Sequence, residues 1–448
     1  MLALAALDLG LEAGVVVPAL PVLAQHYHAS VIGVGWLVTG FLLASAVATP
    51  LAGRVGDMYG KRRMLLVSLA AFACGSLVCA VTDSIAVAIA GRVIQGLGAA
   101  TGALVLGLVR DTLPPALIPR GIGVVVGATA AGGSVGLLVS GLLVDWFSAM
   151  AIFWFLFALA VVLSLAVAAT VEESRVRADT HVDLAGAATL GAGLALLLLA
   201  ISKGREWDWW SSRTLGVFAA SAVLLAAFVV VERRVGQPLV DLRLVVARPF
   251  LQANVCTFAF GYSFLIAVLL IPLLAAAPPA SGYGLGLSTI GIGWILLPNG
   301  LAGLFAGWAA GRVVERVGPR ALVAAGAVLG IVAYTWFANA HDTRPELIAG
   351  TAVLGLGWGL VLTGVFRVVM RGAGSGETSV AFAVNTVIRF VAVSVGGQVA
   401  FAIVSGAGAV GPFPAGIGYT RAFVMGAIGA GVLLLASAFL PGRMAVRR

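Results

Sequence analysis

Long apolar segments alternate with short charged or glycine- and proline-rich turns along the whole chain of 448 residues. Each apolar run is continuous rather than alternating, and is about 20 residues long, as an α-helix needs to cross a hydrocarbon core of about 30 Å. Lipid leaves the backbone only helices or closed barrels, and continuous runs favour helices. The pattern predicts about fourteen spans, at residues 2–24, 32–53, 63–81, 84–108, 119–145, 150–170, 183–202, 213–231, 250–277, 289–311, 321–339, 346–370, 378–405 and 419–440.

Composition indicates an all-α polytopic membrane protein. Hydrophobic residues make up 61% of the chain and charged residues 10%, whereas soluble domains carry about a quarter charged residues. The net charge of +9 would suggest a nucleic-acid partner in a soluble protein, but with a cytoplasmic amino terminus about 20 of the 27 Lys and Arg residues fall in inside loops. This asymmetry argues against nucleic acid and predicts a multi-pass protein of the plasma membrane with both termini cytoplasmic.

A short charged motif occurs twice, as GRVGDMYGKRRML at 53–65 and as GRVVERVGPRALV at 311–323. The copies are 258 residues apart and follow the second and the tenth predicted span. Two six-helix halves with an extra pair of helices between them would place both copies in equivalent hinges, and parallel repeats of this kind occur in transporters. We therefore expect an amino-terminal six-helix bundle at 1–172, two inserted, peripheral helices with flanking loops at 173–247, and a carboxyl-terminal six-helix bundle at 248–448.

The stretch GRVGDMYGKRR resembles the loop signature of the major facilitator superfamily, and the fourteen-span pattern resembles its fourteen-helix drug:proton antiporter branch over essentially the whole chain. The resemblance implies two six-helix bundles around a central cavity, with a hinge that latches the cytoplasmic side when the cavity opens outward. Asp57 can accept charge-assisted hydrogen bonds from Arg54 or from the facing half. The predicted gating residues are Arg54, Asp57, Arg62, Glu315 and Arg320. The alternative is that these charges only anchor the topology.

Two acidic residues, Asp8 and Glu12, lie within the first span, in LDLGLEAGVVVPALP. A spacing of four places both carboxylates on one helical face, and ionisable groups at membrane depth usually face a cavity, a partner or a proton path. Because two neighbouring carboxylates cannot both ionise cheaply, we predict that they bind and release a proton as the cavity changes side. The resemblance supports Asp8, since LDxT followed by ALP is usual in this branch; here Gly10 replaces the Thr, and Glu12 has no counterpart. The alternative places Asp8 in the interface and leaves Glu12 as a lone cavity acid.

Arg92 and Gln95 lie among small residues of the fourth span, in GRVIQGLGAATG. A buried Arg needs a counter-charge or carbonyl partners, and Asp8 and Glu12 are candidates. The stretch resembles the superfamily's fourth-helix motif, which is associated with proton transfer, and this implies that Arg92 modulates a nearby acid. A purely structural ion pair is the alternative.

The fifth span is rich in glycine, which permits close helix packing. The antiporter branch usually carries Gly-Pro-x-x-Gly-Gly in this span. The chain has Gly136, Leu137, Leu138, Val139, Ser140 and Gly141 instead. The Pro is missing and Ser140 replaces a Gly, and this departure argues against antiport more than it argues against the fold.

In the carboxyl-terminal half, Asn385 and Arg389 lie four residues apart, on one face of the thirteenth span. Apart from Glu346 at the first position of the span 346–370, no acid lies within the spans of this half, so the candidate partners of Arg389 are backbone carbonyls, Asn385, Asn299 or an anionic substrate. The residues predicted to line a substrate cavity are Gln95, Tyr262, Trp294, Asn299, Trp358, Asn385 and Arg389. The alternative for each is packing, carbonyl pairing or interfacial anchoring.

The sequence contains no nucleotide-binding loop, metal-ligand cluster or nucleophile paired with a base. We therefore expect a monomeric secondary transporter rather than an enzyme, with no cofactor and a proton gradient as its energy source. The predicted function is export of hydrophobic or cationic small molecules by alternating access, as in multidrug efflux. The first alternative is a transporter of lipids or other amphipathic metabolites, and the second is a non-transporting receptor or scaffold.

Overall fold

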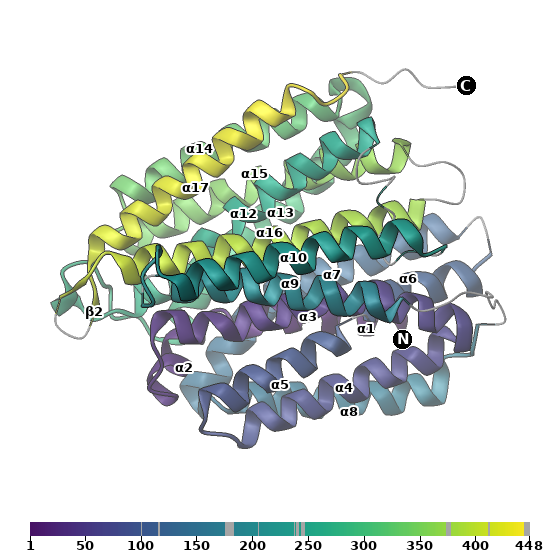
Figure 1. Ribbon diagram of the computed structural model, residues 1–448, viewed down its shortest axis with the longest axis horizontal. Helices are drawn as coiled ribbons and strands as arrows, with labels where there is room; N and C mark the ends of the chain where they lie inside the picture. Colours follow the sequence, from purple (N-terminus) through teal and green to yellow (C-terminus); the bar gives the residue numbers. More distant parts are fainter. Residues whose placement is uncertain are drawn as a thin grey trace. The chain divides into compact units, whose positions relative to one another are not determined.

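The computed structural model describes residues 1–99, 101–114, 117–174, 183–204, 206–236, 238, 242, 247–372, 378–410 and 413–442. The chain forms two compact units, Met1–Val240 and Asp241–Arg448 (Figure 1). In this division the two predicted inserted helices belong to the first unit. The three-part domain arrangement stays a prediction.

Among the described residues of the first unit, the regular secondary structure is α-helical. Their bounds are α1 Leu2–Val15, α2 Leu20–His26, α3 Val31–Tyr59, α4 Lys61–Val81, α5 Ile85–Gly98, α6 Thr101–Thr112, α7 Ile118–Trp146, α8 Ala151–Thr170, α9 Leu184–Lys203 and α10 Ser212–Arg234. Helix α1 packs along α7, α3 along α5, and α4 against both α5 and α8. A core of buried aliphatic side chains such as Leu65, Leu104, Val125 and Leu163 joins α4, α6, α7 and α8.

The second unit is also helical, with one short ribbon. Its elements are α12 Arg248–Ala276, η1 Pro279–Ser281, α13 Thr289–Val317, α14 Pro319–Asn339, α15 Arg344–Gly372, α16 Thr378–Gly406, β1 Ala409–Val410, β2 Phe413–Pro414 and α17 Gly416–Ser437. The two strands pair antiparallel. Helix α15 packs against α13 and α14, and α12 packs against α16 and α17. Phe250, Val323, Val361 and Leu433 contribute to the core between these layers.

The predicted count of fourteen spans is not confirmed, because the described residues contain 12 helices long and apolar enough to cross a membrane. The first and fifth predicted spans fall on α1 with α2 and on α7. Helix α1 ends at Val15, and at 1.5 Å per residue its 14 residues extend about 21 Å, less than a hydrocarbon core. The helix is interrupted between α1 and α2, where Pro18 lies. Proline has no backbone N–H to donate and disfavours helical geometry at the residue before it. The fourth predicted span falls on α5 and α6, which together count as one of the candidate spans, Ile85–Val109.

The two copies of the charged motif form the same local structure. Helices α3 and α13 each have 29 residues, and α4 and α14 each have 21. One glycine separates the helices in each copy, Gly60 with φ of +119° and Gly318 with φ of +90°. Only glycine adopts this backbone region without strain. The predicted hinge is therefore a single residue, and most of the motif is helical.

The repeat extends to the first turns of these long helices. The Ser30 side chain accepts a hydrogen bond from the Gly33 amide at the start of α3, and Ser288 accepts one from the Gly291 amide at the start of α13. Both serines satisfy amides that have no partner within the helix. The 258-residue repeat is thus carried by helix ends as well as by the charged motif.

The predicted inserted helices, α9 and α10, pack on each other, and α9 also packs on α3. Trp36 Nε1 donates to Ser202 Oγ at 3.2 Å, which ties α3 to α9. Helix α10 buries only Thr214, Ser221, Phe228 and Glu232. Most of its apolar surface is therefore exposed, as a lipid-facing helix requires, and its position at the periphery of the whole protein stays a prediction.

Candidate functional site

Two acidic side chains are buried inside α1. Asp8 and Glu12 are each only 1% exposed. Both carboxylate oxygens of Asp8 and the Oε2 atom of Glu12 have no hydrogen-bond partner among the described residues. Buried polar groups are normally paired, and charge at membrane depth is costly. A carboxylate in this position is suited to take up a proton, because protonation removes the buried charge.

The helix that carries these acids is in backbone contact with α7. A Cβ atom at Gly10 would lie 1.8 Å from the Thr129 carbonyl oxygen, and one at Gly132 would lie 1.9 Å from the Leu7 carbonyl oxygen. Neither position can hold a larger residue without moving the two backbones apart. The packing role predicted for glycines of the fifth span therefore involves α1, and it explains why Gly10 stands where the family pattern has Thr.

Arg92 lies in α5 and is 2% exposed. Its Nε atom donates to the Leu37 carbonyl at 2.8 Å, and its Nη1 atom donates to Gln95 Oε1 at 2.6 Å. The guanidinium also lies 4.4 Å from the centre of the Phe41 ring. Gln95 in turn donates to Ser76 Oγ at 2.6 Å. Arg92 and Gln95 are thus held by α3, α4 and α5.

The predicted proximity of Arg92 to the first-span acids is not realised as an ion pair. Among the described residues no salt bridge within 4.0 Å joins Arg92 to Asp8 or Glu12. Arg92 instead pairs directly with a backbone carbonyl, and it interacts electrostatically with Glu12 at a longer distance. The role of Arg92 as a modulator of a proton site stays a prediction.

Around the first charged motif, Asp57 pairs with Lys61 rather than with Arg54. Lys61 Nζ lies 2.8 Å from Asp57 Oδ1 and 2.7 Å from Asp111 Oδ2. The Ser174 hydroxyl donates to the same Asp111 oxygen at 2.6 Å. This network joins the start of α4 to α3, to α6 and to the segment after α8.

A second carboxylate, Glu173, covers the start of α4. It accepts hydrogen bonds from the backbone amides of Arg62 at 2.9 Å and Arg63 at 3.1 Å. A Cβ atom at Gly60 would lie 2.6 Å from the Glu173 carboxyl carbon, so glycine is required for the acid to approach. Asp111 and Glu173 were not predicted from the sequence. Each of them follows a predicted span, 84–108 for Asp111 and 150–170 for Glu173, on the same side of the membrane as the charged motif. This pattern could have marked both acids as candidates, but it does not show which residue each one contacts.

Two of the remaining predicted gating residues, Arg54 and Arg62, contact backbone carbonyls. Arg54 Nη2 donates to the Pro238 carbonyl at 2.5 Å, and Arg62 Nη2 donates to the Ala168 carbonyl at 2.6 Å. In the second copy Arg320 is exposed, and the Glu315 side chain lies outside the described residues. The predicted latch role of these residues stays a prediction.

In the second unit, polar side chains of α12 and α16 meet. Asn385 Nδ2 donates to Asn254 Oδ1 at 3.1 Å and to Thr257 Oγ1 at 2.7 Å. Arg389 lies one turn further along α16, and its Nε atom is buried without a hydrogen-bond partner among the described residues. Asn385 and Asn299 were predicted as partners of Arg389, but among the described residues neither forms a hydrogen bond with it.

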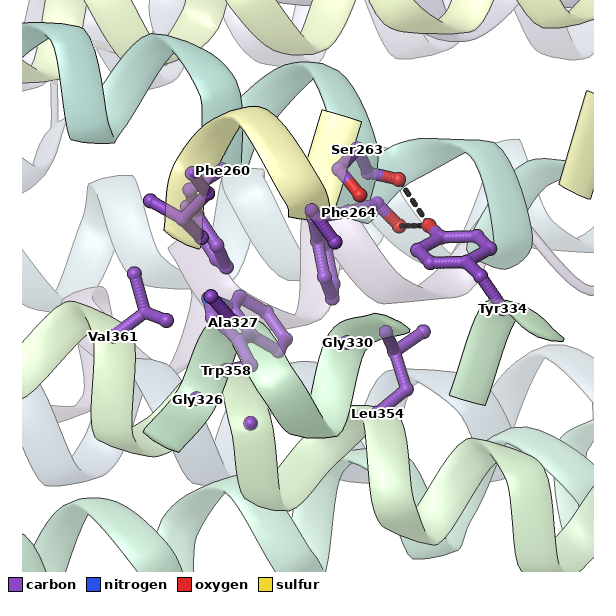
Figure 2. A pocket seen from close by; sticks show the side chains of 13 residues that line it. Phe260, Ser263, Phe264, Gly326, Ala327, Gly330, Tyr334, Leu354, Trp358 and Val361 are labelled. Carbon is purple, nitrogen blue, oxygen red and sulfur yellow. Dashed lines mark hydrogen bonds between the residues drawn. The ribbon is translucent and has the colours of Figure 1, made fainter. Parts of the chain in front are cut away.

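Trp358 lines a cavity of about 20 Å³ within the second unit, enough for a single water molecule. Figure 2 shows it beside Phe260 and Phe264, and the ring centres of Trp358 and Phe264 are 3.8 Å apart. On another side of the cavity, Tyr334 donates to the Ser263 backbone carbonyl (Figure 2). This aromatic cluster packs α12 against α14 and α15, and contact of Trp358 with substrate stays a prediction.

The other predicted cavity residues differ in exposure. Trp294 is 57% exposed on α13, on the same face as the exposed Leu301 and Trp308. Asn299 is buried, and its Nδ2 atom donates to the Thr351 carbonyl at 3.3 Å, so it joins α13 to α15. Tyr262 is partly buried beside α16. A Cβ atom at Gly396 of α16 would lie 2.2 Å from the backbone carbonyl oxygen of Tyr262.

Within the described ranges, no group of three or more His, Cys, Asp or Glu side chains is arranged to hold a metal ion. Three separate candidate clusters are described: the buried acids of α1 and the network at the charged motif in the first unit, and the polar residues of α12 and α16 in the second unit.

Long apolar helices that keep acids and arginines in their interiors are the architecture of a membrane transport protein. The model of the Major Facilitator Superfamily matches residues 2–397, and the chain belongs to this family. The resemblance seen in the charged motif is thus confirmed. The chain is a multi-pass membrane transporter and not an enzyme.

Similar proteins include exporters. The chain is 30% identical over 370 residues to the tetracenomycin C resistance and export protein of Streptomyces glaucescens, covering 81% of this chain and 67% of that protein. It is 28% identical over 397 residues to the multidrug resistance protein Stp of Mycobacterium tuberculosis, covering 85% and 72%. Among solved structures, the human organic anion transporter MFSD10 (TETRAN) matches 98% of both chains with a TM-score of 0.65 and 20% identity, a likeness in fold alone.

Proposed function

We propose that this protein is a proton-coupled exporter of hydrophobic or cationic small molecules that works by alternating access. In this proposal it lies in the plasma membrane with fourteen spans and cytoplasmic termini, acts as a monomer, and needs no cofactor. The names of its relatives, which include drug resistance and export, support the export of small molecules.

The observation that carries the proposal is that both carboxylate oxygens of Asp8 and the Oε2 atom of Glu12 are buried inside α1 without a hydrogen-bond partner among the described residues. A structural acid would have hydrogen-bond donors or a cation around it, because a buried unpaired carboxylate destabilises the fold. Proton binding neutralises the acid at membrane depth, and release on the other side regenerates it. This exchange can link the direction of the cavity to the proton gradient.

The close contact between α1 and α7 supports a coupled movement. Gly10 and Gly132 place the backbones of α1 and α7 in direct contact. A movement of the turn that carries Asp8 would therefore move α7 as well, because no flexible side chains lie between the two backbones to absorb it. The network of Lys61, Asp57 and Asp111 would hold the start of α4 in one state and release it in the other.

The test is transport of ethidium, a hydrophobic cation, into proteoliposomes with and without an imposed pH gradient. The wild-type protein is expected to accumulate ethidium only with the gradient. Asp8→Asn should lose accumulation while still binding ethidium, and the exposed acid variant Glu172→Gln should behave as wild type. Unchanged accumulation in both Asp8→Asn and Glu12→Gln would contradict the proposed proton site.

The same vesicles separate the alternative functions. Gradient-independent movement of a fluorescent phospholipid, without ethidium accumulation, would favour the lipid or amphipathic-metabolite transporter. Binding without movement of either probe would favour a receptor or scaffold.

A further inference from the structure

Two hydrogen-bond donors without acceptors lie on neighbouring helices of the second unit. Asn254 of α12 is 6% exposed, and its Nδ2 atom has no hydrogen-bond partner in the described part of the chain. Arg389 of α16 has a buried Nε atom that is equally without a partner among the described residues. Both helices are candidate membrane spans.

Asn385 and Thr257 fix the orientation of Asn254. The Asn385 amide group donates to Asn254 Oδ1 and to Thr257 Oγ1, so the Asn254 oxygen is occupied and its amino group remains available. Such an arrangement presents a donor in a defined direction, and leaving it unsatisfied is costly in apolar surroundings.

Arg389 extends the donor set deeper into the membrane. It lies about 16 Å along α16 from the first residue of that helix, at 1.5 Å per residue. No acid pairs with it within 4.0 Å among the described residues, and its contact with an aromatic ring, that of Phe390, is 5.6 Å long. A guanidinium at this depth needs an acceptor, because hydrocarbon cannot replace its hydration.

The backbone beside Arg389 is arranged for close approach of the two helices. A Cβ atom at Gly261 of α12 would lie 3.1 Å from the Arg389 carbonyl oxygen. The polar residues are thus on adjoining stretches of α12 and α16, with Asn254 and Thr257 beside Asn385 and Gly261 beside Arg389. Asn254 and Arg389 therefore lie along one stretch of the contact between α12 and α16, a polar zone between two apolar helices.

We propose that Asn254 and Arg389 bind an oxygen acceptor, a carboxylate or a ring carbonyl, of an otherwise hydrophobic substrate. This inference rests on the proposed export function and adds to it a preference, among hydrophobic substrates, for compounds that carry such an oxygen. The apolar helices around the donors favour a hydrophobic remainder, while the donors select the oxygen, since a site built to hydrogen-bond a polar group discriminates against analogues that lack it.

The test measures binding to purified protein in nanodiscs by fluorescence anisotropy, without any gradient. Pyrenebutyrate supplies a carboxylate, acetylpyrene a neutral carbonyl, and ethylpyrene the same ring system without an oxygen. Acetylpyrene or pyrenebutyrate should bind about tenfold more tightly than ethylpyrene. Arg389→Gln should weaken pyrenebutyrate most, and Asn254→Leu should weaken every oxygen-bearing probe to which the wild-type protein binds.

Matched controls are Arg421→Gln, an exposed Arg of α17, and Asn339→Leu, an exposed Asn at the end of α14. Both should bind all probes as wild type does. If Arg389→Gln does not fold, Arg389→Lys and Thr257→Val provide milder changes to the same zone. Equal binding of ethylpyrene and the oxygen-bearing probes, or variants that leave their preference unchanged, would overturn the proposal. Because no gradient is used, failure of proton coupling leaves this result unaffected.

Discussion

The side-chain carboxylate of Glu173 accepts a hydrogen bond from the backbone amide of Arg62 at 2.9 Å, across 111 positions of the sequence. The same carboxylate accepts from Arg63, so it occupies the position of an N-cap for α4, where Gly60 itself has no side chain to offer. An acid here also interacts favourably with the helix dipole. Glu173, which follows the sixth predicted span, therefore caps the helix that begins in the charged motif and links these two parts of the chain.

Replacing this cap should loosen the start of α4. Glu173→Ala removes the acceptor for two amides, and loss of an N-cap typically costs about 0.5–2 kcal/mol. We expect a lower midpoint of thermal unfolding in detergent, measured by intrinsic fluorescence. Glu172→Ala changes the neighbouring exposed acid and should leave the midpoint unchanged. Equal midpoints for both variants would show that the cap does not contribute to stability.

A second prediction concerns the ion pair between Lys61 and Asp111. Lys61 is 9% exposed and pairs with both Asp57 and Asp111, so Lys61→Met removes the cation from two carboxylates, of which the Asp111 side chain is only 12% exposed. The expected cost is about 1–3 kcal/mol in the free energy of unfolding. Arg63→Met removes a nearby exposed charge and should cost much less.

The pair itself is measured by a double-mutant cycle. Adding Asp111→Asn to Lys61→Met should recover part of the lost stability, because the uncompensated charge is then gone. Strictly additive effects of the two substitutions would contradict a direct interaction.

Much of the fold could be predicted because its signals are local or periodic. Continuous apolar runs locate most helices, and the 258-residue repeat places Gly60 and Gly318 at equivalent turns. The break after α1 was missed because Pro18 interrupts a segment that hydropathy alone joins.

The partners within the site could not be predicted in the same way. Lys61 and Asp111 are 50 residues apart, and their pairing depends on how α3, α4 and α6 pack. Arg92 binds the Leu37 carbonyl, and every residue has such a carbonyl, so no side-chain pattern marks it. The sequence could locate the ionisable residues at membrane depth, and only the folded structure separates Arg92, which is satisfied, from Asp8, which is not.

A third prediction tests the contact between α1 and α7. Gly10→Ala introduces a Cβ atom 1.8 Å from the Thr129 carbonyl oxygen, and relieving such overpacking typically costs about 1–3 kcal/mol. Gly216→Ala is the matched control, because a Cβ at this helical position meets nothing within 4 Å. It should keep or slightly raise stability, since alanine favours helix over glycine by about 1 kcal/mol.

The outcome bears on why Gly10 departs from the family pattern. Gly10→Thr, which restores that pattern, should be worse than Gly10→Ala, because a branched side chain adds atoms against the same carbonyl. A Gly10→Thr variant with wild-type unfolding temperature and wild-type ethidium transport would show that α1 and α7 are not held in backbone contact.

The last prediction separates a functional role of the buried acids from a structural one. Asp8 and Glu12 have carboxylate oxygens without partners, and burial of an unsatisfied polar group costs about 1–3 kcal/mol. Asp8→Leu and Glu12→Leu should therefore raise the midpoint of thermal unfolding, while Asp8→Leu abolishes gradient-driven ethidium accumulation. Glu172→Leu, at an exposed acid, should change neither quantity. Stability gained where activity is lost is expected of sites kept for function, whereas a fall in stability for both leucine variants would identify the acids as structural.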